Sequence, residues 1–599
     1  MLTFFYGGTG TGKSYAMMDK IKQVAENGRK VCVIVPDQFT FEYEHMLYNH
    51  LGCALFNKGN TEVWSFSRLA ADIFRCTKAP EGMGADSTVK TAVMYKVIRL
   101  ISEREVLLFF DKQAKRASFA NTALTMLSEL IHSGVTPEIL GEILKTAPDN
   151  MRDKLTDLFL IYSEYSSELA ALGMRDILLD ARLAADMAEQ NGYFDDMCLF
   201  MDEFKSFTGD QYNMIRVMLS QCAELTVCMT SDDIGKGGFG PFTAVNETCA
   251  GLSSIAAELG KKINKVKFDD NRRYKSEELF ELSKNLLRLP SKAYNGDGGN
   301  ITLVTAPDIY GECDYICAAI CELTAADSSL RYSDIAVLSR AMNDDISVLA
   351  PHFERYNIPY YSDKKRPAGH KPLMLMVTAA LELAAEKKPS TEVLLRYAKT
   401  GLTQVSEEDI AYLENYCYTW DIDGSMWQSE FPDEKAEDIR LRLLTPINSL
   451  KKACSGKTGA QICDALRSFI SETGAEEKLL SFEGKYITEA ESAAQIRENE
   501  WLCSQLDEIF ASLEQALTEK ISLSDFREIF MLSAEKITLA APPDALDGVI
   551  AQQSDLARLT NPKIVFVMHA NDGIFPFITG ESSTFSERER EFFKKSDYD

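Results

Sequence analysis

The feature that most constrains this chain is a glycine-rich loop that follows its first apolar segment. Residues 2–6 are apolar or aromatic except for one threonine, which is typical of a buried strand. The loop follows directly and reads Gly7-Gly8-Thr9-Gly10-Thr11-Gly12-Lys13-Ser14. This sequence matches the phosphate-binding pattern G-x-x-x-x-G-K-S at every fixed position. We therefore expect residues 7–14 to bind a nucleotide.

Each part of the loop has a chemical role in this interpretation. The glycines let backbone N–H groups curl closely around an anionic phosphate. Lys13 is expected to bring its ammonium group to the β- and γ-phosphates of ATP, and the Ser14 hydroxyl is expected to bind Mg²⁺. A helix after the loop would direct its N-terminus at the same phosphates.

The plain alternative is a glycine-rich turn that contains Lys-Ser by chance. The neighbouring sequence argues against it, because Met17, Ile21 and Val24 recur at helical spacing and Asn27-Gly28 is a typical helix stop. A second apolar strand is expected at residues 31–35. Strand, loop, helix and strand thus occur in the order that a nucleotide-binding α/β domain requires.

A later apolar segment, residues 197–201, ends in the acidic pair Asp202 and Glu203. Beside a phosphate-binding loop, such a strand end holds Mg²⁺ through its Asp and orients the attacking water through its Glu. We therefore assign Asp202 to the metal and Glu203, with Lys13, to catalysis. The alternative is that the two acids simply begin a helix. Another strand, at residues 225–232, ends in small polar groups that could sense the γ-phosphate.

Composition and size indicate a protein of several domains, because 599 residues exceed what one core supports. The formal net charge of −26 argues against general adhesion to nucleic acid, although it leaves room for a local groove. Basic clusters at residues 261–267 and 364–366 are more often solvated loops than phosphate-binding tracks. No apolar run has the length of a membrane span, and the N-terminus resembles a strand rather than a signal peptide. We therefore expect a cytoplasmic protein without membrane contact.

The 14 cysteines are scattered through apolar segments, which indicates reduced thiols rather than a disulfide framework. Cys313, Cys317 and Cys321 are spaced four residues apart and so share one face of a helix. No histidine or fourth thiol accompanies them. This pattern favours a packed helix face over a metal site.

Strand-like and helical stretches alternate along the chain in a pattern that predicts an α/β fold with two parallel-sheet domains, each interrupted by a helical insertion. A linker rich in Gly, Asn and Ser at residues 290–300 separates the two. In the second domain, strands are expected at residues 301–306, 334–340 and 563–568. The expected boundaries are 1–84 and 190–290 for the first, ATP-binding domain, 85–189 for its insertion, 300–380 and 541–599 for the second domain, and 381–540 for its insertion.

This organisation, with Walker motifs in the first domain, resembles the UvrD type of superfamily 1 DNA helicases, which contain two RecA-like domains. Several segments are also similar to the AddB family, the B subunits of the bacterial AddAB helicase–nuclease. The similarity runs in order over essentially the whole chain. The segments that carry it are residues 33–42, 331–338, 356–363, 399–402 and 413–416.

The resemblance implies a helicase/exonuclease subunit that processes DNA double-strand breaks for homologous recombination together with an AddA-like partner. In that family AddA is the translocating motor, whereas AddB contributes recognition of the Chi sequence, a nuclease domain and an iron–sulfur cluster. The nuclease and cluster residues would follow residue 599, so the chain is expected to be an N-terminal fragment. The implied ligands are ATP, Mg²⁺ and single- and double-stranded DNA.

The resemblance also implies a role for Arg340, which ends a predicted strand and matches the fourth-motif arginine that reaches the γ-phosphate across the domain interface. Other motifs depart from the family pattern. Lys205 replaces the usual Gln after the acidic pair, no residues are available for an adenine-reading Gln before the loop, and the fifth motif, between Asp547 and Asp572, is hard to recognise. ATP binding is therefore expected to be retained, whereas coupled translocation is not.

Two functional hypotheses follow. The first is an ATP-hydrolysing, helicase-like enzyme subunit, which Glu203 favours. The second is a nucleotide-binding, DNA-scanning scaffold without ATPase or helicase activity of its own, which the departing motifs favour. A small-molecule kinase with the same loop is disfavoured, because residues 301–599 would then have no purpose.

Overall fold

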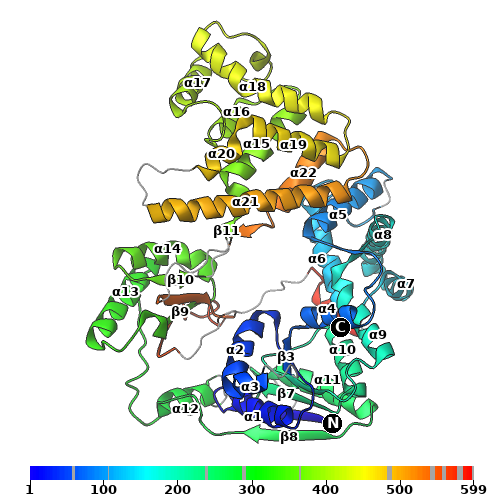
Figure 1. Ribbon diagram of the computed structural model, residues 1–599, viewed down its shortest axis with the longest axis vertical. Helices are drawn as coiled ribbons and strands as arrows, with labels where there is room; N and C mark the ends of the chain where they lie inside the picture. Colours follow the sequence, from blue (N-terminus) through cyan, green and yellow to red (C-terminus); the bar gives the residue numbers. More distant parts are fainter. Residues whose placement is uncertain are drawn as a thin grey trace. The chain divides into compact units, whose positions relative to one another are not determined.

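The computed structural model describes most of the chain, which folds into two compact units (Figure 1). The first unit comprises residues 1–85, 125–303 and 585–599, and the second comprises residues 86–124 and 304–584. The residues outside the description are 57–60, 105–106, 236–239, 287–289, 291, 363–365, 482–488, 540–546, 556, 558–561, 577–583 and 596–599. The basic pair Lys364-Lys365 falls among them.

A six-stranded sheet is the centre of the first unit. Its strand order is β3-β2-β6-β7-β1-β8, and every neighbouring pair runs parallel, as the apolar runs of the sequence predict. The strands are β1 (Leu2–Gly7), β2 (Val31–Ile34), β3 (Thr61–Trp64), β6 (Cys198–Met201), β7 (Glu224–Thr230) and β8 (Ile263–Phe268).

Helices cover both faces of this sheet, because successive side chains of a strand point to opposite sides. On β1, Phe4 packs in a core with α4, α9, α10 and α11, whereas Phe5 packs in another core with α1 and α2. The helices of this unit are α1 (Lys13–Glu26), α2 (Thr40–Leu51), α3 (Cys53–Phe56), α4 (Phe66–Cys76), α7 (Pro137–Lys145), α8 (Asp149–Ala171), α9 (Asp180–Asn191), α10 (Gly209–Gln221), α11 (Thr243–Glu258), α12 (Glu277–Asn285) and α23 (Glu587–Lys595). The α/β class predicted from the sequence is confirmed, and the six parallel strands fit a RecA-like domain.

The segment expected as the first insertion is indeed largely helical, but the two units divide it. Helix α5 (Ser87–Glu103) belongs to the second unit, and α6 (Phe119–His132) continues from the second unit into the first. Within the first unit, a short parallel pair joins β4 (Met83–Ala85), just before this segment, to β5 (Met174–Asp176), near its end. The compact units divide the chain between residues 85 and 86, one residue from the expected start of the insertion, and again between residues 124 and 125.

The second unit contains a smaller sheet of four parallel strands in the order β10-β13-β9-β14. Its strands are β9 (Ile335–Ser339), β10 (Tyr360–Ser362), β13 (Val549–Gln553) and β14 (Ile564–Val567), and an antiparallel pair joins β11 (Arg366–Pro367) to β12 (Thr538–Leu539). Helices α13 (Ile309–Ala326) and α14 (Met342–Arg355) pack on the sheet through a common core. The predicted strands at 334–340 and 563–568 are thus present.

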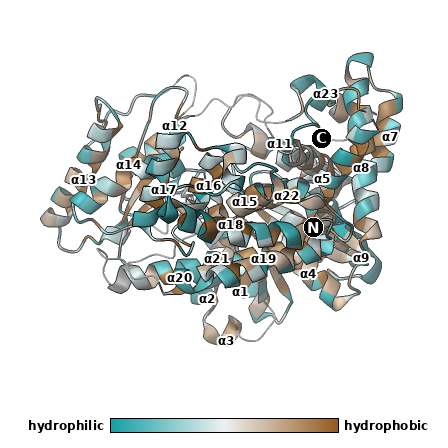
Figure 2. Cartoon of the chain, turned by 90° about the horizontal axis from the view of Figure 1, so that it is seen from above, coloured by the Kyte–Doolittle hydropathy of each residue, from teal (hydrophilic) through white to brown (hydrophobic). Residues whose placement is uncertain are grey.

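The rest of the second unit is helical, as the periodicity of residues 381–540 predicts. Its helices are α15 (Pro372–Ala385), α16 (Thr391–Ala398), α17 (Glu407–Trp420), α18 (Glu434–Cys454), α19 (Gly459–Thr473), α20 (Ala475–Leu480), α21 (Glu489–Ala516) and α22 (Leu523–Ala534). Helix α5 is tied to this group, because Tyr95 donates a hydrogen bond to Asp525 at 2.8 Å. In Figure 2 the helices carry both hydrophilic and hydrophobic residues, as helices with one buried face do.

One strand prediction is wrong. Residues 301–306 form no strand, although their composition is strand-like, and the side chain of Leu303 is 90% exposed. A strand needs a neighbour that pairs with its N–H and C=O groups, and no described residue takes this place. Apolar alternation alone could not reveal the missing neighbour.

The cysteines are free thiols, and Cys313 and Cys317 lie in the core beneath α13. Within the described part of the chain, no group of three or more His, Cys, Asp or Glu residues is arranged to hold a metal ion. Nor does any helix of the described residues combine the length and the apolar character needed to cross a bilayer.

Candidate nucleotide-binding site

The glycine-rich loop joins the carboxyl end of β1 to the first turn of α1. Residues 7–14 therefore lie at the carboxyl ends of the parallel strands. Gly10 and Gly12 adopt positive φ angles of 72° and 86°, which side chains other than glycine rarely adopt. Gly7 is required for a different reason. A Cβ atom there would lie 2.1 Å from the carbonyl oxygen of Phe268 on β8. The glycines therefore allow both the turn and the close approach of the neighbouring strand.

Lys13 begins α1 and is buried, with its Nζ donating a hydrogen bond to the carbonyl oxygen of Gly8 at 2.7 Å. Burial lowers the pKa of the Lys13 ammonium, and the negative charges of Asp202 and Glu203 oppose that shift. The ammonium group is thus held over the loop itself, between the turn and the two acids. This is the position from which a cation neutralises bound phosphates.

Asp202 follows β6, which is separated from β1 by β7 alone, and its side chain is only 4% exposed. Burial raises the pKa of the Asp202 carboxyl, while hydrogen bonds from Ser14, the backbone N–H of Glu203 and Tyr43 act in the opposite direction. Tyr43 donates from α2 at 3.1 Å, and the Glu203 N–H donates at 2.9 Å. The two residues expected to bind the metal, Ser14 and Asp202, are therefore in contact.

A hydroxyl and one carboxylate fit Mg²⁺ in a nucleotide site. Mg²⁺ keeps several waters and is commonly held by one or two protein oxygens together with substrate phosphates. The hydrogen bond between Ser14 and Asp202 brings the two oxygen ligands to one point beside the loop. These residues would hold the ion, and the ion would supply charge neutralisation at the phosphates.

Glu203 adopts a positive φ of 66°, unusual for a residue with a side chain, which turns it away from the strand direction of β6. Glu203 is exposed at the surface, but desolvation by the surrounding protein atoms, and then the neighbouring Asp202 charge, raise its pKa to about 7. A carboxylate with a pKa near neutrality is suited to accept a proton from water. Its role in water activation remains a prediction.

The end of β7 also meets the loop. The backbone N–H of Ser231 donates to the Gly7 carbonyl oxygen at 3.1 Å, and the Ser231 hydroxyl donates to Asn246 on α11 at 2.8 Å. The small polar group expected there thus lies beside the first loop residue, fixed by its hydrogen bond to a helix.

Sequence reasoning missed a segment after β8 that contacts the glycine-rich loop. The Arg272 backbone N–H donates to the Gly10 carbonyl oxygen at 2.9 Å, and the Tyr274 hydroxyl lies 2.9 Å from the Thr9 hydroxyl oxygen. A Cβ atom at Gly10 would lie 2.8 Å from the Cβ of Arg273. Residues 272–274 therefore pack against the outer side of the turn.

Arg273 is the functional candidate of this segment. Its charge lowers the pKa of both Lys13 and Glu203, so its guanidinium lies near both expected catalytic side chains. The one indication of this segment in the sequence is a pair of adjacent arginines a few residues after the strand. The basic cluster predicted from the sequence covers residues 261–267. It ends within the edge strand β8 and does not include the two arginines.

Arg340, the third expected catalytic residue, lies in the second unit at the end of β9. Its Nη1 is 2.6 Å from a carboxylate oxygen of Asp555, which follows β13. The guanidinium is thus paired with an acid of its own unit. The contact of Arg340 with a γ-phosphate remains a prediction.

Other polar groups at the same edge of this sheet are bound to one another. Ser339 donates a hydrogen bond to Asp345, and His569, at the end of β14, has ring nitrogens 3.3 Å from carboxylate oxygens of both Asp345 and Glu312. These contacts join β9, β14, α13 and α14. They make a closed network rather than an open set of donors.

A family model and similar curated proteins both relate this chain to AddB-type subunits. Residues 4–283 match the family model described as ADDB, N-terminal. Over 613 residues the chain is 28% identical to the B subunit of the ATP-dependent helicase/deoxyribonuclease of Clostridium novyi (strain NT), covering 99% of this chain and 53% of that protein. The proteins of the same name from Clostridioides difficile (strain 630) and Thermoanaerobacter sp. (strain X514) are each 28% identical, over 98% of this chain and 53% of theirs. The chain spans about half the length of the curated relatives it matches.

Proposed function

Because the chain belongs to the AddB family, we propose that it is the ATP-binding, helicase-like part of a protein that acts with an AddA-like partner. The assembly would bind single- and double-stranded DNA and process double-strand breaks for homologous recombination, with a scanning role for the AddB-like chain. The relatives are named as the B subunits of an ATP-dependent helicase/deoxyribonuclease, which supports this interpretation. No nuclease or iron–sulfur ligand is assigned to any residue here.

The observation that carries the nucleotide-binding part is the contact between Ser14 and Asp202 beneath a loop closed by Lys13. A chance glycine-rich turn has no reason to place a hydroxyl, a buried carboxylate and a lysine together. These are the ligands and the counter-charge that Mg²⁺ and phosphates need. ATP with Mg²⁺ is therefore the proposed ligand.

A binding titration tests this proposal. Lys13→Ala should abolish binding of a fluorescent ATP analogue in the presence of Mg²⁺, because the buried counter-charge is lost. Lys22→Ala removes the same charge from a partly exposed position of α1 and is the matched control, which should bind as the wild type does. Equal binding by the wild type and Lys13→Ala would refute the assignment of the loop.

The second candidate is a DNA-scanning scaffold that binds nucleotide without hydrolysing it. Lys205, in place of the usual Gln, and the pairing of Arg340 with Asp555 favour it. An ATPase assay with DNA and the AddA-like partner separates the two, because only the enzyme loses turnover when Glu203 is changed. A wild type that binds ATP but shows no turnover above the Glu203→Gln level would favour the scaffold.

A further inference from the structure

Residues 86–124 differ in charge from the rest of the chain. The chain carries a net charge of −26, yet this segment contains seven Lys or Arg residues and four Asp or Glu residues. A polyanion is repelled by most of such a protein, so its contacts must be concentrated where cations gather. The segment is therefore the natural place to look for an anion-binding surface.

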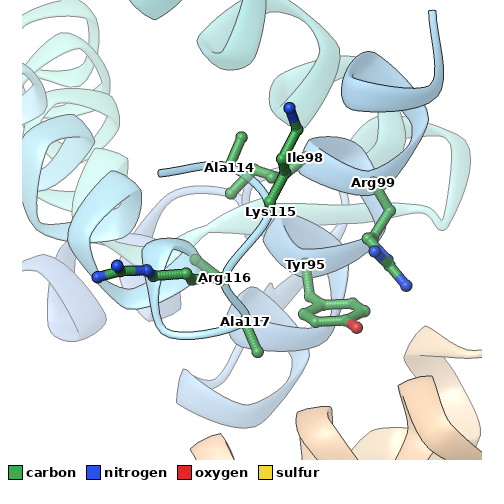
Figure 3. A pocket seen from close by; sticks show the side chains of 8 residues that line it. Tyr95, Ile98, Arg99, Ala114, Lys115, Arg116 and Ala117 are labelled. Carbon is green, nitrogen blue, oxygen red and sulfur yellow. The ribbon is translucent and has the colours of Figure 1, made fainter. Parts of the chain in front are cut away.

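Three of these cations belong to residues around one small depression of the second unit, and their charged ends point in different directions. Arg99 of α5 and Lys115 and Arg116 of the following loop line the same surface depression, together with Tyr95 and small alanine side chains (Figure 3). In this view the cationic side chains extend from two neighbouring segments of the chain.

The loop that carries the cations is anchored from below. Leu107, Phe110 and Ala114 are buried, and the ring of Phe110 lies 5.1 Å from that of Phe119. The Ala114 N–H donates to the Phe110 carbonyl oxygen at 2.9 Å, so the loop turns tightly on its apolar residues. The charged side chains therefore project from a fixed support, which reduces the entropy lost when they bind.

Arg99 is also held in place. Its Nη2 is 2.9 Å from a carboxylate oxygen of Asp525, and its guanidinium lies 5.8 Å from the centre of the Tyr95 ring. The Tyr95 hydroxyl donates to the same carboxylate at 2.8 Å. Half of the Arg99 side chain remains exposed, so it can still face a ligand.

Acids accompany the cations of this surface. Asp525 pairs with Arg99, Glu103 and Glu528 lie near Arg99 and Tyr95, and the Lys115–Asp111 pair, at 3.2 Å, is exposed on both sides. Exposed pairs of this kind contribute little and are easily exchanged. Within the described residues, neither Lys112 nor Arg116 has an ion pair. We call Arg99, Lys115 and Arg116 the α5 basic surface.

The ordinary interpretation of exposed lysines and arginines is a solvated surface. Here three cations line one depression in a strongly acidic chain, and two of them stand on an anchored loop. We propose that the α5 basic surface binds the phosphate backbone of DNA, independent of base sequence. This inference rests on the proposed function and supplies a contact surface whose residues differ from those of the nucleotide loop.

Fluorescence anisotropy with the chain and a labelled single strand, or a duplex of equal length, tests the proposal across about 50 to 200 mM salt. Lys115→Glu/Arg116→Glu should weaken binding roughly tenfold or more at the lowest salt, since two phosphate contacts become repulsive. The slope of log affinity against log salt should fall by about 1.4 for the single strand or about 1.8 for the duplex. The strand that shows the larger loss is the one that this surface binds.

Two further variants control the experiment. Lys387→Glu/Lys388→Glu reverses two adjacent exposed charges elsewhere in the same unit and should bind DNA like the wild type. Lys115→Gln/Arg116→Gln removes the charges without reversal and should show a smaller loss. Circular dichroism and thermal unfolding should be unchanged in all three, because Lys115 and Arg116 are exposed.

Each remaining outcome decides a different question. Equal affinity and slope for the wild type and Lys115→Glu/Arg116→Glu would overturn the α5 basic surface while the proposed function stands. A wild type that binds no DNA at low salt would instead overturn DNA binding by this chain, and with it the proposed function. Competition by an acidic peptide as strong as by DNA of equal charge would refute DNA and indicate an acidic protein partner.

Discussion

The carboxyl edges of the two parallel sheets present polar groups in different ways. In the first unit, β1 opens into a glycine loop, with the Lys13 ammonium over it and the Asp202 carboxylate beside Ser14. In the second unit, Arg340 is paired with Asp555, and His569 lies between two carboxylates. The same sheet architecture thus supports a glycine-rich turn beside a lysine and a carboxylate in one unit and a network of mutually bonded polar groups in the other. What separates them is local chemistry at the strand ends, not the fold.

The first prediction, with the largest effect, concerns Glu203. Glu203→Gln should lower ATP turnover by about 10²–10⁴-fold if the carboxylate accepts a proton from water. The wild-type rate should rise with pH through about 7, where the Glu203 carboxyl ionises, and the variant should lose this limb. Glu44→Gln, an exposed position on α2, is the control. Identical pH profiles of wild type and Glu203→Gln would remove Glu203 from the mechanism.

The raised pKa of Glu203 also predicts a stability effect with a definite sign. The carboxyl pKa rises from its usual 4.5 to about 7, so between these values the folded chain binds more protons than the unfolded chain. The stability of the wild type should therefore fall as pH rises through this window, relative to Glu203→Gln. Urea unfolding at about pH 5 and about pH 8 measures this difference. A wild type that gains stability over the variant with rising pH would contradict the environment described for Glu203.

The second prediction compares the arginines of the two sheets. Arg273→Gln should weaken ATP binding about tenfold, since charge-assisted contacts to phosphate contribute roughly 1.5–3 kcal/mol. Because Arg273 lowers the pKa of Glu203, its loss should also move the pH limb upward. Arg340→Gln should leave ATP affinity nearly unchanged, because Asp555 already pairs with Arg340. A larger loss of affinity in Arg340→Gln than in Arg273→Gln would reverse the comparison.

The third prediction concerns Tyr43, whose hydrogen bond supports the carboxylate of Asp202, the expected metal ligand. Tyr43→Phe removes a donor to the buried Asp202 carboxylate and should lower the free energy of unfolding by about 1.5–3 kcal/mol. The pKa of Asp202 should rise further, so Mg²⁺-dependent ATP binding should weaken most at low pH. Tyr15→Phe, at a largely exposed position, should change neither. Calorimetric unfolding and ATP titrations at two pH values measure these effects, and equal results for the two variants would rule out this support.

The smallest effect is expected in the second unit. Asp555→Asn breaks an ion pair that is partly open to solvent, and pairs of this kind contribute about 0–1 kcal/mol. Chemical unfolding should therefore shift only slightly, and ATP binding by the first unit should not change. A loss of several kcal/mol would show that the polar network of this sheet is more strongly coupled than its exposure indicates.

The sequence predicted the first sheet well because its signals are local. Strand β1, the glycine turn and α1 are contiguous, so the pattern of residues 2–26 contains the whole motif. The sequence indicated Asp202 as a candidate because an acidic strand end beside such a loop is typical of a metal ligand, and the structure places it next to Ser14. Its hydrogen bond to Tyr43, however, joins residues 159 positions apart and had no signal in the sequence.

Two shortcomings of prediction from the sequence share one cause. Residues 301–306 have the composition of a strand but lack a described neighbour to pair with. Arg273 lies just beyond what looked like a solvated basic stretch, although β8 brings it back to the loop. In both cases the outcome depended on which distant segment lies alongside, and composition does not record that.

The sequence by itself determined the glycine-rich turn between strand and helix, the α/β class and the unpaired cysteines, because each depends on short-range pattern or overall composition. The tertiary structure decided which charges meet. It placed Arg273 near Glu203, paired Arg340 with Asp555, and gathered Arg99, Lys115 and Arg116 around one depression. Electrostatic interactions depend on distance and burial, and both are set only when segments remote in the sequence pack together.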